Sequence, residues 1–472
     1  METIIQQIMR EWLENITKYL LEDGIGDISK ASKDMLEMSK ENINQILKAV
    51  IEDLDLALIG AKSERKEDGF TIKERQVERT IMVDTGDLKY NRTYFSLGKE
   101  YVYLVDNLIG VEPYDRISKQ VEKELIKCAA NVSMQKSADY VTCGKVTRQT
   151  VKNKISNLGE LAIVPERREI TPNELHIFAD EDHVNLQSGN NTIVPLITTT
   201  EGVRNVCKGR NELINPVHFQ GYAMSPEKQW EYVEAVLSRI YDMDKVDKVY
   251  IHGDGAYWIA RSKDVFPNAI HVLDGFHINK RMKMLCAGYT ENQYPLKLWR
   301  ALRNDSKDEF RIHIENMFFE ISSENLGEKA LKIIKAKKDH ANYILNNWEA
   351  IQERFKSPVG SCTEGLISHI LSDRLSRNPM GWSKLGLSKM AMLRVYVKNG
   401  GIIENDDLGV NKKKKEVSRK IVKYEELVTR RLDKVVKETF DFSLFEEKEY
   451  INPKVTGTTM LLNRYGRINE VS

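Results

Sequence analysis

The sequence has little of what marks a secreted, disulfide-stabilised or membrane-spanning protein. Its 472 residues include five cysteines, an odd number, and no two of them form a Cys-x-x-Cys pair. This usage indicates neither a zinc ribbon nor a disulfide framework and fits a reducing compartment. No apolar run approaches the length of a membrane span, and Glu2, Glu11 and Glu14 interrupt the N-terminal apolar pattern, unlike a signal peptide. We therefore expect a cytoplasmic protein that has no membrane partner.

The chain also lacks a strong net charge. Its 71 Lys and Arg residues nearly balance 70 Asp and Glu residues, so the formal net charge is +1. A global field that attracts nucleic acid is therefore excluded, and any basic surface must be local. The composition, 41% hydrophobic and 30% charged, is typical of a globular protein rich in surface charge. The length fits two to four domains.

The first 110 residues change from a helical to a strand pattern. Apolar residues at three-to-four spacing predict a helical region over residues 1–75, interpreted as a bundle or dimerisation arm. Over residues 76–110, the runs 79–83, 88–95 and 101–105 are separated by turn sequences and predict a small antiparallel β unit. Tyr90, Arg92 and Tyr94 are interpreted as residues of the sheet surface.

Residues 111–165 are predicted to hold a helix-turn-helix. Residues 133–141 favour one helix, Gly144 a turn, and Thr147 caps a second helix over residues 148–157. From Ser118 to Asn157 there are eight Lys and Arg residues against three acids. Arg, Gln and Asn side chains read base edges, and Lys binds phosphates. We predict that double-stranded DNA binds the outer face of the second helix, which carries Arg148, Gln149, Lys152, Asn153 and Lys154.

Residues 170–280 follow an α/β pattern. Three strands at 175–179, 191–199 and 216–222 precede a helix at 226–240, and strands at 249–251 and 269–273 flank a helix at 256–265. This order resembles that of ribonuclease H. Residues 281–356 have only helical spacing and predict an all-helical insertion of two or three helices. Residues 357–400 are assigned to the final helices of the catalytic domain, with Ser361 or Thr363 as the cap of the first.

The tail, residues 401–472, is predicted to be basic. Its segment from Lys412 to Glu438 has eleven Lys and Arg residues against five acids. Both phosphate binding and a solvated helix with salt pairs fit this pattern.

Three carboxylates stand where a mixed sheet of this order brings side chains together. Asp254 follows a buried strand within Gly253-Asp254-Gly255, Asp180 follows the first strand, and Glu364 lies in the first turn of the helix after the insertion. Carboxylates that converge repel each other unless cations bind between them. Mg²⁺ prefers oxygen ligands, and two such ions support in-line phosphodiester cleavage. We therefore predict two Mg²⁺ ions, which Mn²⁺ can replace, bound by these residues.

Two points of this site stay open in the sequence. Asp182 is an alternative to Asp180 as the first metal ligand, because the two lie on the same side of a strand while Glu181 faces away. His277, three residues after the candidate fourth carboxylate Asp274, either approaches the scissile phosphate or is structural. Trp382 either stacks on a base or packs in the core.

Several segments resemble bacterial insertion-sequence transposases of the DDE class, specifically the ISLre type. They are Phe178 to Gln187, Ile251 to Ile259, Val272 to Lys280, Glu364, and Pro379 to Ser383. More distantly the chain is similar to Mutator-like transposases, which carry Cys-x-x-His where this chain has Asp274-x-x-His277.

The resemblance implies a ribonuclease-H-like mixed sheet interrupted by the helical insertion, and Mg²⁺ dependence. It also implies binding to terminal inverted repeats and target DNA by a homo-oligomer in the bacterial nucleoid. The activity implied is DNA cleavage and strand transfer, with Asp180, Asp254, Glu364 and His277 in the catalytic site. The alternative is a DNA-binding regulator derived from a transposase and lacking catalysis.

Overall fold

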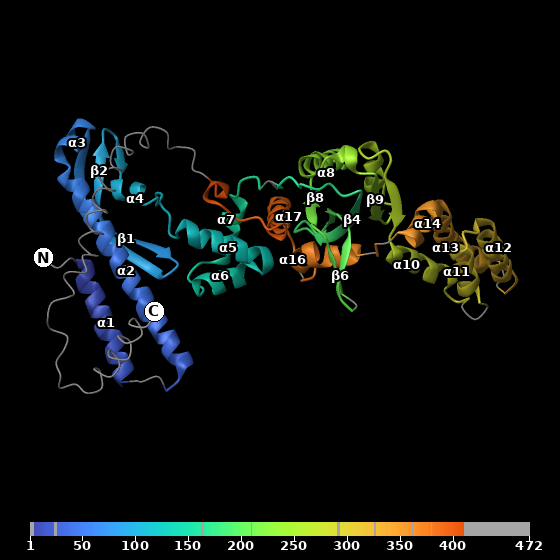
Figure 1. The fold of residues 1–472 in the computed structure, drawn as a ribbon, viewed down its shortest axis with the longest axis horizontal. Coiled ribbons are helices and arrows are strands. Elements are labelled where there is room, and N and C mark those ends of the chain that lie inside the picture. Colours follow the sequence, from blue (N-terminus) through green and yellow to red (C-terminus); the bar gives the residue numbers. More distant parts are fainter. Residues whose placement is uncertain are drawn as a thin grey trace, which may run out of the picture. The chain divides into compact units, whose positions relative to one another are not determined.

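The computed structural model describes residues 4–22, 26–161, 165–208, 210–289, 293–324, 327–357, 359–360, 362–378 and 380–409. They form two compact units that divide near residue 121, within α5 (Lys119–Asn131) (Figure 1). The basic stretch from Lys412 to Glu438 and the residues Ser361 and Pro379 lie outside the described ranges. Among the helices in those ranges, none combines the length and apolarity needed to cross a membrane.

The first unit contains a helical hairpin and a three-stranded sheet. Its elements are α1 (Ile4–Glu22), α2 (Ile28–Gly60), α3 (Lys62–Glu67), β1 (Phe70–Val83), β2 (Gly86–Leu97), β3 (Glu100–Val102) and α4 (Leu104–Leu108). The strands are antiparallel in the order β1-β2-β3, as predicted. The predicted boundary at residue 75 is wrong, because β1 begins at the fully buried Phe70.

The predicted strand over 101–105 is also wrong at its end. Leu104 and Val105 are both buried, which a helical turn permits but a strand with one covered face does not. The interpretation of Tyr90 and Arg92 as residues of the sheet surface is also wrong. Both side chains are buried, where Asp106 accepts a hydrogen bond from Tyr90 and pairs with Arg92.

A five-stranded mixed sheet lies at the centre of the second unit. It consists of β4 (Glu174–Asn185), β5 (Asn191–Thr200), β8 (Val217–Gln220), β9 (Lys248–Gly253) and β10 (Ile270–Leu273), in the order β10-β9-β4-β5-β8. The pairs β4–β5 and β5–β8 are antiparallel, while β4–β9 and β9–β10 are parallel. A hairpin of β6 (Val203–Cys207) and β7 (Arg210–Leu213), which the sequence did not predict, follows β5.

Helices cover both faces of this sheet. Odd-numbered residues of β4, among them Leu175, Ile177 and Ala179, share a core with Trp230 of α8 (Pro226–Ile240). The helix predicted over 256–265 is short: α9 (Tyr257–Ala260) continues as the 3₁₀ turn η2 (Arg261–Asp264). Even-numbered residues of β4 face the C-terminal helices, so the strand alternates between two cores.

The insertion has more helices than predicted. Within its described residues it contains α11 (Tyr294–Arg303), α12 (Lys307–Glu324), α13 (Glu328–Asn346) and α14 (Trp348–Lys356), preceded by α10 (Gly275–Cys286). The apolar positions identified by helical spacing do form its core. Leu302, Phe310 and Ile344 are fully buried there, and Trp299 and Tyr343 pack against them.

The chain returns to the sheet through a segmented helix. α15 (Thr363–Ile367) continues as the π-helical turn η3 (Ser368–Ser372) and α16 (Asp373–Leu375), and α17 (Lys384–Lys398) and the 3₁₀ turn η4 (Asn405–Asp407) follow. Thr363 is the first helical residue and not the cap, and the capping position, Cys362, makes no side-chain capping hydrogen bond. Trp382 is buried and donates to the carbonyl of Leu375, so it packs in the core and does not stack on a base.

Candidate functional site

The strand register brings three aspartates to one edge of the sheet. Phe178 of β4 pairs with His252 of β9, and His252 pairs with Val272 of β10. Two residues further along each strand stand Asp180, Asp254 and Asp274. The amide of Asp274 donates to the carbonyl of Gly253 at 2.9 Å, which keeps the two chains adjacent at this level. The three side chains therefore lie side by side across neighbouring strands.

The sequence predicted a strand that ends just before Asp180, but β4 continues through Asp180 to Asn185. It lies just beyond the last residue that pairs with β9, where the sheet loses a neighbour on one side. Burial, together with the negative charges of Asp254, Glu364 and Asp274, raises the pKa of Asp180 to about 7. Asp180, Asp254, Asp274 and Glu364 are called the acid cluster below.

Asp254 is half-buried in a tight turn. Its carboxylate accepts a hydrogen bond from the amide of Ala256 at 2.8 Å, and Gly255 has a φ of +81°. A Cβ on Gly253 would lie 2.8 Å from the side chain of Ile259 and 3.0 Å from the carbonyl oxygen of Ala179. Both glycines are thus explained by the tight turn and by contacts within the protein.

Glu364 reaches the cluster from the other side of the insertion. It is exposed in the first turn of α15, and its neighbour Thr363 is buried and donates a hydrogen bond to the carboxylate of Asp274. Asp274 also caps α10 by accepting from the amide of Phe276. The contact between Thr363 and Asp274 therefore fixes the start of α15 against the end of β10.

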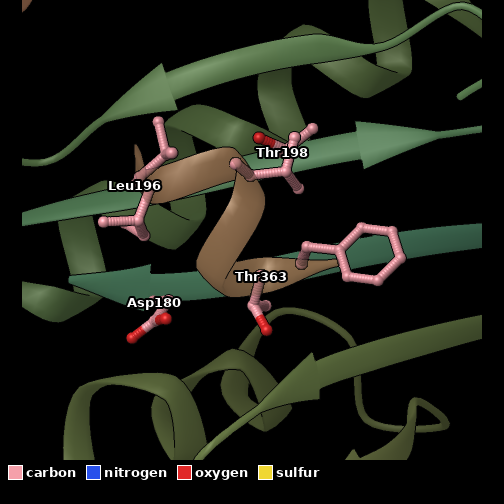
Figure 2. A pocket seen from close by; sticks show the side chains of 7 residues that line it. Asp180, Leu196, Thr198 and Thr363 are labelled. Atoms are coloured by element: carbon pink, nitrogen blue, oxygen red, sulfur yellow. The ribbon is translucent and has the colours of Figure 1, made fainter. Parts of the chain in front are cut away.

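A small pocket marks where α15 crosses the sheet. It is lined by Phe178, Asp180, Leu196, Thr198, Thr363, Leu366 and Ile367. Figure 2 shows Asp180 on its strand and Thr363 on the helix that crosses above it. Apolar side chains fill most of the wall, so Asp180 has protein on one side. This environment explains why burial is the largest cause of its raised pKa.

The carboxylate of Asp182 accepts hydrogen bonds from two serine side chains near the C-terminal helices. One of its oxygens accepts hydrogen bonds from Ser372 at 3.0 Å and Ser376 at 2.8 Å, and its side chain is buried. The second oxygen is buried without a hydrogen-bond partner among the described residues. Glu181 faces the opposite core, as expected, where it accepts from the indole of Trp258. The geometry favours Asp180 over Asp182 as the acid of the cluster.

His277 and His252 lie in different surroundings. His277 lies in the first turn of α10, half-buried, with its ring edge-on to Phe276. His252 is buried, 3.0 Å from His176 between ring nitrogens, and burial lowers its pKa to about 3. A neutral, stacked His252 is structural, as the sequence indicated.

Tyr343 of α13, in the insertion, was not predicted to contact the candidate site. Its hydroxyl donates to the carbonyl of Asp254, and its ring is stacked by Arg281 at 4.5 Å from the guanidinium carbon. Burial, followed by the charge of Asp254, raises the pKa of Tyr343 to about 12. A helical position 89 residues away from Asp254 carries no local signal of this contact.

The helix-turn-helix prediction agrees with local structure in most details. Ser133 caps α6 (Met134–Thr142), Cys143 and Gly144 form a left-handed turn, and Thr147 caps α7 (Arg148–Ser156). Four of the five predicted DNA-binding residues are exposed: Arg148, Gln149, Lys152 and Asn153.

Lys154 is different, because its ammonium pairs with Glu122 of α5 at 2.6 Å and is half-buried. This pairing removes Lys154 from the exposed face of α7, and we correct that prediction. Gln149 donates to Asn153 at 2.8 Å, so these two side chains share one surface.

The acid cluster has carboxylate oxygens of the kind that bind metal ions, but these oxygens are not arranged around a common point. Within the described ranges, no three His, Cys, Asp or Glu side chains are close enough to hold an ion as they stand. Burial is the largest cause of the raised pKa of Asp180, and the negative charges of Asp254, Glu364 and Asp274 add to it.

Comparisons with known proteins agree on one family. The sequence profile of the Uncharacterised protein family (UPF0236) matches residues 21–438. A UPF0236 protein of Caldanaerobacter subterraneus subsp. tengcongensis is 35% identical over 406 residues, covering 84% of this chain and 83% of its own, and its name joins eleven loci.

Two further relatives from the same organism are equally similar. One is 36% identical over 397 residues, which cover 82% of each chain. The other, whose name joins four loci, is 35% identical over 435 residues, which cover 89% of each chain. The extent of the match and the identity leave one assignment: the chain is a member of the UPF0236 family.

Proposed function

We propose that this protein is a DNA transposase of the DDE class with a ribonuclease-H-like catalytic domain. The observation that carries the proposal is that Asp180, Asp254 and Asp274 stand two residues beyond paired positions of three neighbouring strands, with Glu364 in the first turn of the helix that Thr363 ties to Asp274. Cleavage and joining of DNA strands need acids in such an arrangement, and no protein nucleophile is required.

The sheet supports the proposal through its topology. Three antiparallel strands are followed by a helix and two strands parallel to the first, in the order β10-β9-β4-β5-β8. This is the strand arrangement expected of a ribonuclease-H-like domain. The helical insertion lies in the chain between β10 and α15, so Glu364 follows it in sequence and returns to the sheet in space.

The residues present fit divalent cations. All donors of the cluster are carboxylate oxygens, which Mg²⁺ and Mn²⁺ prefer, and burial together with the neighbouring acids raises the pKa of Asp180 to about 7. Asp180, Asp254 and Glu364 would hold the ions, with Asp274 beside them. When bound, such ions activate a water or a 3′-hydroxyl and stabilise the leaving oxygen of a phosphodiester.

The surrounding residues position the acids. Tyr343 holds the backbone of Asp254, and Thr363 ties the start of α15 to Asp274. Both contacts keep Glu364 and Asp254 near Asp180 before any ion binds. His252 and His176 form a buried pair on the two strands that lead to Asp254 and Asp180.

DNA binding by α7 completes the proposal. The exposed Arg148, Gln149, Lys152 and Asn153 have the chemistry of base and phosphate recognition. The relatives add a genomic argument, since one protein name covers eleven loci and another covers four. Many copies of one coding sequence in a genome are expected of an element that copies or moves itself. A homo-oligomer assembled on two element ends in the nucleoid is part of the same proposal.

Nicking of terminal-repeat DNA tests the function. We would incubate the protein with labelled DNA containing the inverted repeats that flank its gene, with Mg²⁺, Mn²⁺ or chelator. Metal-dependent nicks at the repeat ends are expected for the wild type. Asp254→Asn and Glu364→Gln should abolish them while keeping DNA affinity. Glu181→Gln, which faces the opposite core and keeps an acceptor oxygen for the indole of Trp258, is the matched control and should retain nicking.

The result separates the transposase from the alternative. Specific binding without nicking in any metal would favour a DNA-binding regulator that lacks catalysis. Absence of binding to the repeats would contradict both. Nicking that survives Glu364→Gln would show that the cluster is not the catalytic centre.

A further inference from the structure

The helix that carries Glu364 contains a π-helical turn. α15 passes into η3 over Ser368–Ser372 and then into α16. A π turn is rare, costs hydrogen-bond quality and occurs often at functional sites. Because one residue of an α-helix spans about 100°, relaxing this turn to an α-helix would rotate Glu364 by about that angle relative to α16. Whatever holds the turn therefore sets the direction of Glu364.

A buried guanidinium holds it. Arg394 of α17 is 3% exposed and donates to the carbonyls of His369 at 2.8 Å and Ile370 at 2.7 Å. Both acceptors lie within η3. From the opposite side Asp182 accepts from Ser372, the last residue of the turn, and from Ser376. The turn is thus clamped between a cation on α17 and an anion on β4.

The same guanidinium reaches the helix that precedes the helix-turn-helix. Arg394 also donates to the carbonyl of Ala130 at 3.0 Å and the side chain of Asn131 at 2.6 Å, at the end of α5. The negative end of a helix dipole stabilises a buried cation there. Lys154 of α7 pairs with Glu122 of α5, so α5 is joined to the proposed recognition helix as well.

We propose that Arg394 is a positioning residue for Glu364, which locks the π-helical turn and joins it to the DNA-binding helices through α5. This inference rests on the proposed function. It adds that α5, Arg394 and the π-helical turn connect DNA bound by α7 to the carboxylate of Glu364. Binding of the element end therefore promotes assembly of the metal site.

Arg394→Lys tests this role, because lysine keeps the charge but cannot reach four acceptors on two helices. The matched control is Lys389→Met, also on α17, since Lys389 donates to the carbonyls of Leu158 and Gly159 but does not contact η3. Three readouts are measured on the full chain: Mn²⁺ affinity by electron paramagnetic resonance with and without terminal-repeat DNA, DNA affinity, and amide hydrogen exchange of residues 363–376. The third reports on whether the start of α15 and the turn η3 keep their backbone hydrogen bonds.

Arg394→Lys should weaken Mn²⁺ binding about ten-fold, abolish its enhancement by DNA, and speed amide exchange in residues 363–376. DNA affinity should stay within two-fold, and Lys389→Met should leave the Mn²⁺ affinity and this amide exchange unchanged. If Arg394→Lys does not fold, the double variant Ser372→Ala/Ser376→Ala releases the other side of the clamp and should give the same pattern.

The inference and the proposed function can fail separately. Wild-type Mn²⁺ affinity and wild-type amide exchange in Arg394→Lys would overturn the positioning role, as would an equal effect of Lys389→Met. If the wild type binds no Mn²⁺, the metal-dependent function fails, and the amide exchange of residues 363–376 with and without DNA then decides the positioning role.

Discussion

Replacing Asp180 by asparagine should stabilise the metal-free protein at alkaline pH while abolishing its activity. Asp180 has an ordinary pKa near 4 in the unfolded chain and a pKa of about 7 in the folded protein. Folding therefore takes up a proton between these pH values. The contribution of Asp180 to stability is complete below about pH 4, falls as the pH rises, and is least favourable above about pH 7.

The size of the effect follows from the shift. About three pKa units correspond to at most about 4 kcal/mol, at about 1.4 kcal/mol per unit. An asparagine amide still pays for partial burial, so we expect a gain of about 1–2 kcal/mol at pH 8. For a unit of this size that is roughly 2–6 °C in Tm. At pH 4 the Tm of the variant and of the wild type should coincide, because both side chains are then neutral.

Calorimetry of the metal-free protein at pH 4, 6 and 8 measures this. Adding Mn²⁺ at pH 8 should raise the Tm of the wild type and have little effect on Asp180→Asn. Asp182→Ala is the control, since it leaves the hydroxyls of Ser372 and Ser376 without their acceptor and should destabilise the protein at every pH. A stability loss in Asp180→Asn that is equal at all three pH values would refute the electrostatic reasoning.

Three further predictions concern neighbouring contacts. Tyr343→Phe removes the donor to the Asp254 carbonyl, so nicking should fall about ten-fold, by about 1.4 kcal/mol, with substrate affinity kept; single-turnover rates check this. Gly253→Ala places a methyl 3.0 Å from a β4 carbonyl and should cost about 1–3 kcal/mol in denaturant unfolding. Lys152→Ala should weaken DNA binding and reduce the salt slope by about one, whereas Lys154→Ala should reduce stability and leave the slope unchanged, as anisotropy titrations at several salt concentrations would show.

Local patterns predicted the elements on which this site is built. The caps Ser133 and Thr147, the alternation of β4 and the helical spacing of the insertion each depend on residues a few positions apart. Such signals are visible in one sequence because the physics that produces them is local. The same holds for Asp254, where a buried strand ends at two glycines and leaves an acid at a sheet edge.

What the sequence missed depends on contacts between distant segments. The first strand was predicted to end just before Asp180 because the residues that follow are acidic, but pairing with β5 continues β4 to Asn185. Lys154 was predicted to be exposed, but its ammonium pairs with Glu122, 32 residues earlier in the chain. The π turn has no sequence signature, since the groups that stabilise it, Arg394 and Asp182, belong to α17 and β4.

The insertion can separate Glu364 from the aspartates in sequence because the two ends of the insertion meet at the site. α10 begins directly at Asp274, and α15 begins at Thr363, whose hydroxyl donates to that same carboxylate. The hydrogen bond from Thr363 to Asp274 therefore joins the two ends of the insertion at its base, and the length of the insertion does not disturb the spacing of the acids. Tyr343 then gives the insertion a contact of its own with Asp254.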